Sequence, residues 1–124
     1  LLMLTGSVVE AVARQSNFTG TVTRLEDTSN GVIVTFRFEA GSRTKWHTHE
    51  IGQIILVDEG AALIQERGGP VIQLRAGDTN YGGAGVEHWH GASPTEAGAQ
   101  FNVTRGAVTF EEEVSEADLT TPPQ

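Results

Sequence analysis

The chain has 124 residues, which suits a single domain, and its apolar fraction of 38% is ordinary for a globular protein. A formal net charge of -8 disfavours a nucleic-acid partner, because an acidic surface repels the phosphate backbone. No apolar run approaches the roughly 18 residues that would span a membrane, and the stretch Leu1–Leu4 is too short for a secretion signal. With no cysteine for disulfides or thiolate ligands, we expect a soluble cytoplasmic protein without a membrane partner.

Taken in chain order, the sequence predicts one helical segment followed by many short strands. Thr5–Gln15 can form a helical turn or two, and Phe18–Leu25 begins the strand pattern. Glycine-rich turns separate further strands over Val32–Phe38, Lys45–His49, Gln53–Val57, Ala61–Gln65, Val71–Leu74, Thr79–Tyr81, His88–Gly91, Gln100–Arg105 and Val108–Glu113. Many short strands at even spacing are typical of a sandwich or closed barrel, so the predicted fold class is all-β.

The run Val32–Phe38 alternates in polarity. Val32, Val34, Phe36 and Phe38 share one face of this strand, and Thr35 and Arg37 share the other. We predict that the Val/Phe face points into the barrel.

Acidic residues concentrate near the end of the chain. Five of the sixteen lie between Glu111 and Asp118, which predicts a solvated acidic tail over residues 111–124. Ser115 is a candidate N-cap for a short helix to Leu119. We therefore expect one domain over residues 1–124, with a barrel core over about residues 18–113.

All four histidines fall in two His-x-His pairs, His47-Thr48-His49 and His88-Trp89-His90. Residues i and i+2 of a strand project to the same face, so each pair aims two imidazoles at one side. If both pairs point into one barrel, the imidazoles converge, and neutral imidazole is the commonest side-chain metal ligand. The spacing therefore predicts a metal site.

Gln53 follows His49 by four residues, directly after Gly52. Its amide oxygen can supply a fourth ligand, or the residue can be an ordinary polar group at a strand end. Trp46 and Trp89 each precede a histidine, so we expect both indoles to point away from the metal site.

Two glycine-bracketed motifs surround the histidines. Gly41, His47, His49 and Gly60, with Gln53 at a usual glutamate position, resemble the first motif of the cupin superfamily. Gly77, Asp78, Gly85 and His88 resemble the second motif, in which Gly83 replaces the usual proline and no asparagine follows.

The resemblance implies a cupin double-stranded β-helix, a jelly-roll-like barrel of two antiparallel sheets. It also implies one divalent metal ion held by His47, His49 and His88, with Gln53 at the glutamate position. Mn²⁺ is the ion we expect, with Fe²⁺, Ni²⁺ and Zn²⁺ as alternatives. The expected partners are a small-molecule substrate and further copies of this chain, in a homodimer or homotetramer.

Within this superfamily, Trp46–His49, Gly52-Gln53 and His88–Ala92 resemble the small manganese-dependent hydroxynitrile lyases of bacteria. The glutamine in place of glutamate is the most discriminating feature. Those lyases carry another histidine on a downstream strand, and Gln100 stands nearest to that place here. This departure bears on the acid–base half of the mechanism.

A site of three imidazoles and one amide is neutral, so the bound ion keeps its full charge and acts as a Lewis acid. The resemblance therefore implies a lyase that cleaves or forms cyanohydrins. His90 is the candidate catalytic residue for proton transfer, or alternatively a residue that only orients a ligand. The predicted substrate-lining residues are Val34, Phe36, Phe38 and Gln100.

The sequence is compatible with three other functions. The first is a cupin dioxygenase that acts on a phenolic or 1,3-dicarbonyl compound, and the second is a non-catalytic cupin that binds a small molecule. A sugar isomerase activity is the third, although few basic residues lie near the motifs.

Overall fold

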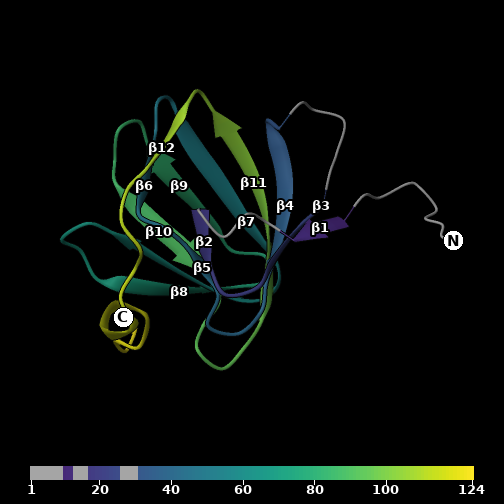
Figure 1. Cartoon of the computed structure of the whole chain (residues 1–124), viewed down its shortest axis with the longest axis vertical. Helices are drawn as coiled ribbons and strands as arrows, with labels where there is room; N and C mark the ends of the chain where they lie inside the picture. The colour runs from purple at the N-terminus through teal and green to yellow at the C-terminus, as the bar shows by residue number, and fades with distance from the viewer. Residues whose placement is uncertain (1–9, 13–16, 26–30) are drawn as a thin grey trace, which may run out of the picture.

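The computed structural model describes residues 10–12, 17–25 and 31–124, and almost all regular structure in this part of the chain is antiparallel β-strand (Figure 1). The strands are β1 (Glu10–Val12), β2 (Phe18–Thr19), β3 (Val22–Leu25), β4 (Ile33–Phe38), β5 (Arg43–Thr44), β6 (His47–His49), β7 (Gly52–Glu66), β8 (Val71–Arg75), β9 (Thr79–Gly83), β10 (His88–Gly91), β11 (Gly98–Arg105) and β12 (Val108–Phe110). One short helix, α1 (Glu116–Leu119), follows. The predicted all-β fold is confirmed.

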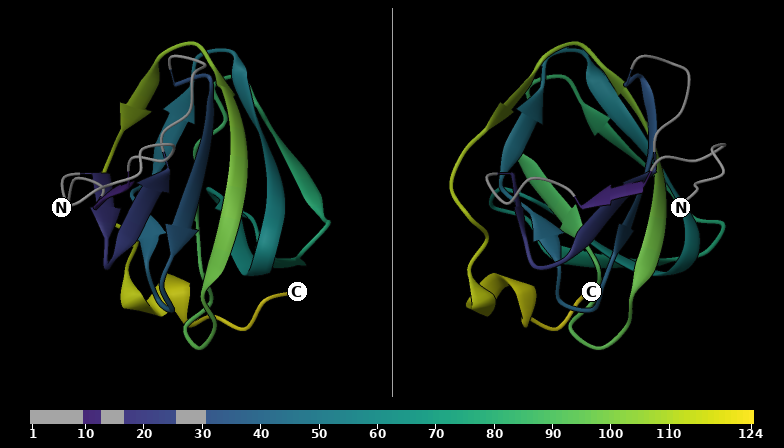
Figure 2. Two further views of the ribbon diagram at one scale, coloured as in Figure 1. Left: turned by 90° about the vertical axis from the view of Figure 1, so that its right-hand side faces the viewer. Right: turned by 45° about the vertical axis from the view of Figure 1, so that its right-hand side comes forward.

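The strands form two sheets that share β7. One sheet has the order β1-β3-β4-β11-β7-β9. In the other sheet, β10 pairs with β5, β6 and β7. In the same sheet β2 pairs with β5, β8 with β7, and β12 with β6. The two sheets curve around a common interior, as the right-hand view of Figure 2 shows. The predicted barrel of two antiparallel sheets is therefore present.

Strand β7 differs from its prediction. The sequence predicts two strands, Gln53–Val57 and Ala61–Gln65, joined by a turn at Glu59-Gly60, but a single strand runs from Gly52 to Glu66. Its register against β11 shifts between Ala99 and Gln100, so the chain bulges here rather than turning back. Gly60 has φ +67°, and a Cβ at this position would meet the Ala97 carbonyl oxygen. The glycine therefore allows β7 to bend from one sheet into the other.

The predicted helix Thr5–Gln15 is wrong where the chain is described. Glu10–Val12 is a strand because it pairs with β3, and the rest of that segment lies outside the described residues. Val32 is a second correction, because it precedes β4 and is 42% exposed. The inward row of β4 therefore begins at Val34 and continues to Phe38.

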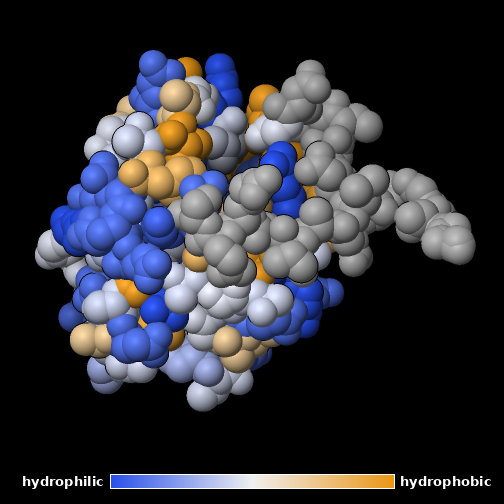
Figure 3. Space-filling model, in the orientation of Figure 1, coloured by the Kyte–Doolittle hydropathy of each residue, from blue (hydrophilic) through white to orange (hydrophobic). Residues whose placement is uncertain are grey.

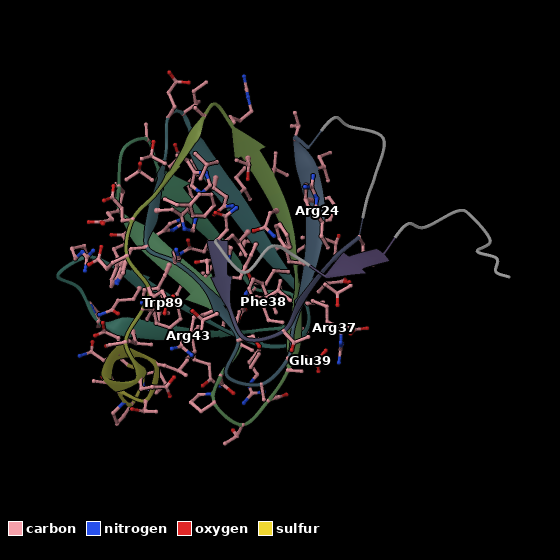
Figure 4. The ribbon with its side chains drawn as sticks, in the orientation of Figure 1. Arg24, Arg37, Phe38, Glu39, Arg43 and Trp89 are labelled. Atoms are coloured by element: carbon pink, nitrogen blue, oxygen red, sulfur yellow. The ribbon has the colours of Figure 1, made fainter. Side chains whose placement is uncertain are left out.

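Apolar side chains pack in two clusters. The inner cluster, between the sheets, contains Phe18, Val22, Phe38 and Ala92, with Phe36 against it. The outer cluster lies behind β10 and contains Trp46, Leu63, Val71, Trp89, Val114 and Leu119. Figure 4 shows Phe38 pointing into the barrel, whereas Arg37 and Glu39, its neighbours in sequence, point away from it.

The C-terminal segment is more than a solvated tail. Its four glutamates are exposed and Asp118 is half buried, but Val114 and Leu119 are buried against the two tryptophans. Arg43 also holds the segment in place, because its guanidinium donates a hydrogen bond to the Val114 carbonyl oxygen at 2.9 Å. Ser115 caps α1 as predicted, accepting a hydrogen bond from the Asp118 amide. The apolar residues of this segment decide its position.

Hydrophilic residues dominate the left-hand side of the face shown in Figure 3. Among the residues that the structure describes, no helix has the length and apolar character needed to cross a membrane.

Candidate metal centre

The two His-x-His pairs meet inside the barrel. β6 and β10 are antiparallel neighbours in which His47 lies opposite His88. Because β-strand side chains alternate, His49 and His90 project to the same interior as their partners, and all four imidazoles are buried. The predicted convergence of the four imidazoles is therefore present.

The four rings form a compact group. The ring centroid of His47 lies 4.8 Å from that of His49, 4.6 Å from that of His88 and 5.2 Å from that of His90. Ring nitrogens of His47, His88 and His90 all lie within 4.8 Å of one another. Three imidazoles can therefore offer nitrogens to one metal ion, with His49 beside them.

Backbone and side-chain oxygens fix the tautomers of two rings. His47 Nδ1 lies 2.8 Å from the Lys45 carbonyl oxygen, which can only accept, so Nδ1 carries the proton. The lone pair of His47 is then on Nε2, which lies 3.1 Å from His88 Nε2 inside the group. A ring whose second nitrogen donates to a backbone carbonyl in this way is typical of metal-ligating histidines.

Gln100 orients His90 in the same manner. Its Nε2 donates to the Gly91 carbonyl at 3.1 Å, so its Oε1 is the end that faces His90 Nδ1 at 2.7 Å. His90 Nδ1 therefore carries a proton and Nε2 is left with a lone pair. Gln100, predicted to line the substrate cavity, is a hydrogen-bond partner of His90.

Unpartnered buried polar atoms lie beside the imidazoles. Among the described residues, neither ring nitrogen of His49 has a hydrogen-bond partner, and neither does Gln53 Oε1. Gln53 Nε2 donates to Thr104 Oγ1 at 3.0 Å, which turns Oε1 away from Thr104. Buried polar atoms are normally paired, so the one nitrogen lone pair of neutral His49 and the lone pairs of Gln53 Oε1 fit a cation. The neutral nitrogen and oxygen donors suit a first-row divalent ion.

Thr104 is a residue that the sequence reasoning missed. It follows Gln100 by four residues on β11, so the strand period of two places both side chains on the inner face. This period was the sequence signal that could have identified Thr104.

If Thr104 orients Gln53, then T104V should weaken metal affinity about 10- to 100-fold. T104S, which keeps the hydroxyl, should bind metal like the wild type. Competition with a chromogenic chelator measures both, and equal affinities in T104V and the wild type would contradict this role.

Burial keeps the imidazoles neutral. Desolvation lowers the pKa of His47 to about 4, although the hydrogen bond to the Lys45 carbonyl raises it. Desolvation, together with the charge of the neighbouring His47, lowers the pKa of His88 to about 3. The pKa of His49 is also lowered by burial, with Gln53 opposing, and burial holds that of His90 well below its usual range. Neutral imidazoles are the form that binds metal.

The lowered pKa values make the metal-free protein sensitive to acid. Between a folded pKa near 4 and the ordinary value of 6.5, the unfolded chain binds more protons than the folded one. The free energy of unfolding should therefore fall by a few kcal/mol as the pH decreases from 7 to 4, since each pKa unit corresponds to about 1.4 kcal/mol. Urea unfolding of the metal-free protein measures this. An H47Q control should show a shallower pH slope, and a stability independent of pH would contradict the assignment.

The predicted lining residues lie beside the imidazoles. Val34, Phe36 and Phe38 follow the inner face of β4, where Phe36 lies opposite Gln100 of β11. Phe38 is fully buried and meets the His90 ring edge-on at 5.9 Å between centroids. An apolar wall therefore stands next to His90.

A second cluster of potential metal ligands, this one acidic, contains Glu87, Glu111 and Glu112, whose carboxylates also lie within 4.8 Å of one another. Arg67 forms ion pairs with Glu87 and Glu112 at 2.9 and 2.8 Å, and its guanidinium stacks 3.8 Å from the Trp46 ring centroid. Glu87 and Glu112 already have a cationic partner, so we assign these two residues and Arg67 to a surface ion-pair network over the outer cluster.

Comparisons with known proteins agree with this geometry. The model of the Cupin domain matches residues 34–111. The "(R)-mandelonitrile lyase" of Granulicella tundricola is 46% identical over 67 residues, which are 54% of this chain and 50% of that protein. The chain thus spans about half the length of this curated relative.

Solved structures extend the likeness over most of the fold. A cupin-like protein from Thermotoga maritima is 34% identical, with a TM-score of 0.81 over 88% of this chain and 90% of that one. An acetylacetone dioxygenase from Acinetobacter johnsonii has a TM-score of 0.62 over 95% of this chain and 78% of that one. At 17% identity, the second likeness shows the fold alone.

Proposed function

Because this chain belongs to the cupin family, we propose that it is a metal-dependent lyase that cleaves or forms cyanohydrins. Its one divalent ion, Mn²⁺, would be held by His47, His49, Gln53 and His88. The observation that carries the proposal is the set of unpartnered lone pairs on His49 and Gln53 beside His47 and His88. The 46% identity to a protein named (R)-mandelonitrile lyase supports the choice of reaction.

The donor set favours polarisation of a substrate oxygen over redox cycling. Three imidazoles and an amide carry no charge, whereas a glutamate at the position of Gln53 would offset part of the ion's charge. When bound, the ion supplies a Lewis acid that lowers the pKa of a cyanohydrin hydroxyl. Gln53 therefore supports a lyase reaction rather than a redox reaction.

His90 is the proton-transfer residue of this proposal. Its Nδ1 is held by Gln100, so its Nε2 lone pair is available to accept the hydroxyl proton of the substrate. The bond between the carbinol carbon and the nitrile carbon then breaks, and its electron pair leaves with cyanide. Cyanide takes the proton from His90, which gives an aldehyde and hydrogen cyanide and restores the neutral imidazole.

The apolar residues Val34, Phe36 and Phe38 support an apolar substrate. An apolar face beside the proton acceptor suits an aromatic or small aliphatic aldehyde portion. Phe36, which is only partly buried and lies 6.1 Å from the Phe38 ring centroid, can offer its ring to an aromatic substrate. Mandelonitrile is therefore the substrate of choice for a first test.

The test is benzaldehyde release from mandelonitrile, followed by its ultraviolet absorbance. Protein reconstituted with Mn²⁺ should cleave mandelonitrile well above the metal-free protein and above buffer with Mn²⁺. An oxygen electrode with a 1,3-dicarbonyl compound tests the dioxygenase alternative, and we expect no oxygen uptake. Absence of cleavage by protein shown to contain the metal would refute the proposed reaction.

A further inference from the structure

An exposed aromatic ring adjoins one of the proposed metal ligands. The ring centroid of Phe110, on β12, lies 5.3 Å from that of His47, and the two rings are tilted by 42°. Phe110 is 38% exposed, whereas His47 is buried. One part of the Phe110 ring therefore faces the imidazole, and another part faces solvent.

The register of β12 explains this position. Phe110 lies opposite His47 of β6, and Val108 lies opposite His49. Directly opposite residues of an antiparallel pair project to the same face of a sheet, so both apolar side chains share the face of the imidazoles. His47 also lies opposite His88 of β10. From β10 to β12, the inner face of this sheet therefore carries His88, His47 and Phe110 in one row.

β12 lies at the edge of its sheet, which leaves these apolar side chains uncovered. Among the described strands, β12 pairs only with β6, and Val108 is 36% exposed. Figure 1 shows β12 beside β6, and Figure 3 shows apolar atoms gathered over β12 next to the hydrophilic side of this face. We call the two residues the apolar rim (Val108, Phe110). The apolar rim borders the histidine group on a side that solvent reaches.

The apolar rim suits a small aromatic molecule. A second aromatic ring placed against the exposed part of Phe110 would remove apolar surface from water and gain the favourable tilted or offset geometry of aromatic pairs. The side chains of Val108 and Phe110 carry no polar group, so they offer no hydrogen bond to a polar substituent. The rim therefore favours an aromatic ring over a polar or charged group.

We propose that Phe110 is a specificity-determining residue that contacts the aromatic ring of the substrate. The proposal rests on the cyanohydrin lyase function above, and it names aromatic cyanohydrins as the substrate class of that site. His47 is a proposed ligand of the ion at which the substrate hydroxyl binds, so the substituent on the carbinol carbon lies within reach of the adjacent Phe110. Phe36, partly buried on the other sheet, can contact the same substituent. A methyl substituent makes far less of this contact than a phenyl ring does.

Substrate preference gives the first test, with kcat/KM measured for mandelonitrile and for lactonitrile, which has methyl in place of phenyl. F110A and F110L should each lower kcat/KM for mandelonitrile about five- to tenfold and that for lactonitrile less than twofold, because both remove the aromatic contact. F110W should keep the preference. F101A is the matched control, since Phe101 is 37% exposed but lies on β11 between buried Gln100 and Asn102, on the outer face. It should leave both values unchanged.

A binding measurement separates this proposal from the lyase activity. The five phenylalanines can be labelled as 4-fluorophenylalanine, with F110L and F101L used to assign two of the ¹⁹F resonances. In protein loaded with diamagnetic Zn²⁺, benzyl alcohol, which cannot be cleaved, should shift the Phe110 resonance, and 1-butanol should shift it less. The Phe101 resonance should not move.

This titration needs no turnover, so it decides the proposal even if mandelonitrile is not cleaved. A Phe110 resonance that benzyl alcohol does not move, or that moves no more than the Phe101 resonance, would overturn the proposal. If the protein cleaves mandelonitrile, an unchanged preference in folded F110A and F110L would also overturn it.

Discussion

Replacing His47 and His49 together by alanine is expected to abolish metal binding. The wild type should hold about one equivalent of first-row metal per chain, and the double variant should retain almost none. The reason is geometric, because His47 offers a fixed Nε2 and His49 offers nitrogens that are otherwise unpartnered in the described structure. Elemental analysis after dialysis against trace metal measures the stoichiometry.

Thr48 provides the matched control. It lies between the two histidines on β6, but its side chain projects to the opposite side of the strand and is only half buried. T48A should therefore keep the wild-type metal content. Retention of the metal by the double histidine variant, with the fold confirmed by circular dichroism, would show that the ion binds elsewhere.

Replacing His90 by alanine is expected to lower kcat for mandelonitrile cleavage by about 10²- to 10⁴-fold, the usual contribution of a general acid–base residue. His90 is buried against Phe38 and held by Gln100. Among the described residues, we therefore expect that only the other clustered histidines could take over its role in proton transfer. Metal content should stay near one equivalent, because the proposed ligand set does not include His90. Steady-state kinetics and elemental analysis on the same sample measure both quantities.

Metal content is the decisive readout for His90. One of its ring nitrogens lies within 4.8 Å of a ring nitrogen of His47 and of His88, so the distances alone also allow His90 to act as a ligand. Loss of metal together with activity in H90A would assign His90 to the ligand set. Q100L offers a graded comparison, since it removes the orienting hydrogen bond but leaves the imidazole in place. It should lower kcat less than H90A does.

Much of the fold and of the site was predictable because strands have a simple period. Alternation along Val34–Phe38 gives the inner face of β4, and the same alternation turns each His-x-His pair inward. Antiparallel pairing of β6 with β10 then brings the two pairs together, which the sequence could only suggest. The family motifs supplied that missing long-range link.

Other features depended on contacts between residues distant in sequence. Gly60 is as compatible with a turn as with a bulge, and only its closeness to Ala97 and the register against β11 make β7 continuous. The C-terminal segment is acidic by composition, yet Val114 and Leu119 find a buried place against tryptophans about 25 to 75 residues away. The orientation of Gln53 by Thr104 likewise required the pairing of β7 with β11.

The most direct measurement is anomalous scattering from a crystal of the Mn²⁺-loaded protein. One peak is expected inside the barrel, within coordinating distance of His47, His49 and His88 nitrogens and of Gln53 Oε1. Such a peak would confirm that the unpartnered lone pairs of His49 and Gln53 are those of a metal centre. A crystal grown with excess Mn²⁺ that shows no peak there, or only one at the surface carboxylates of Glu87 and Glu112, would contradict it.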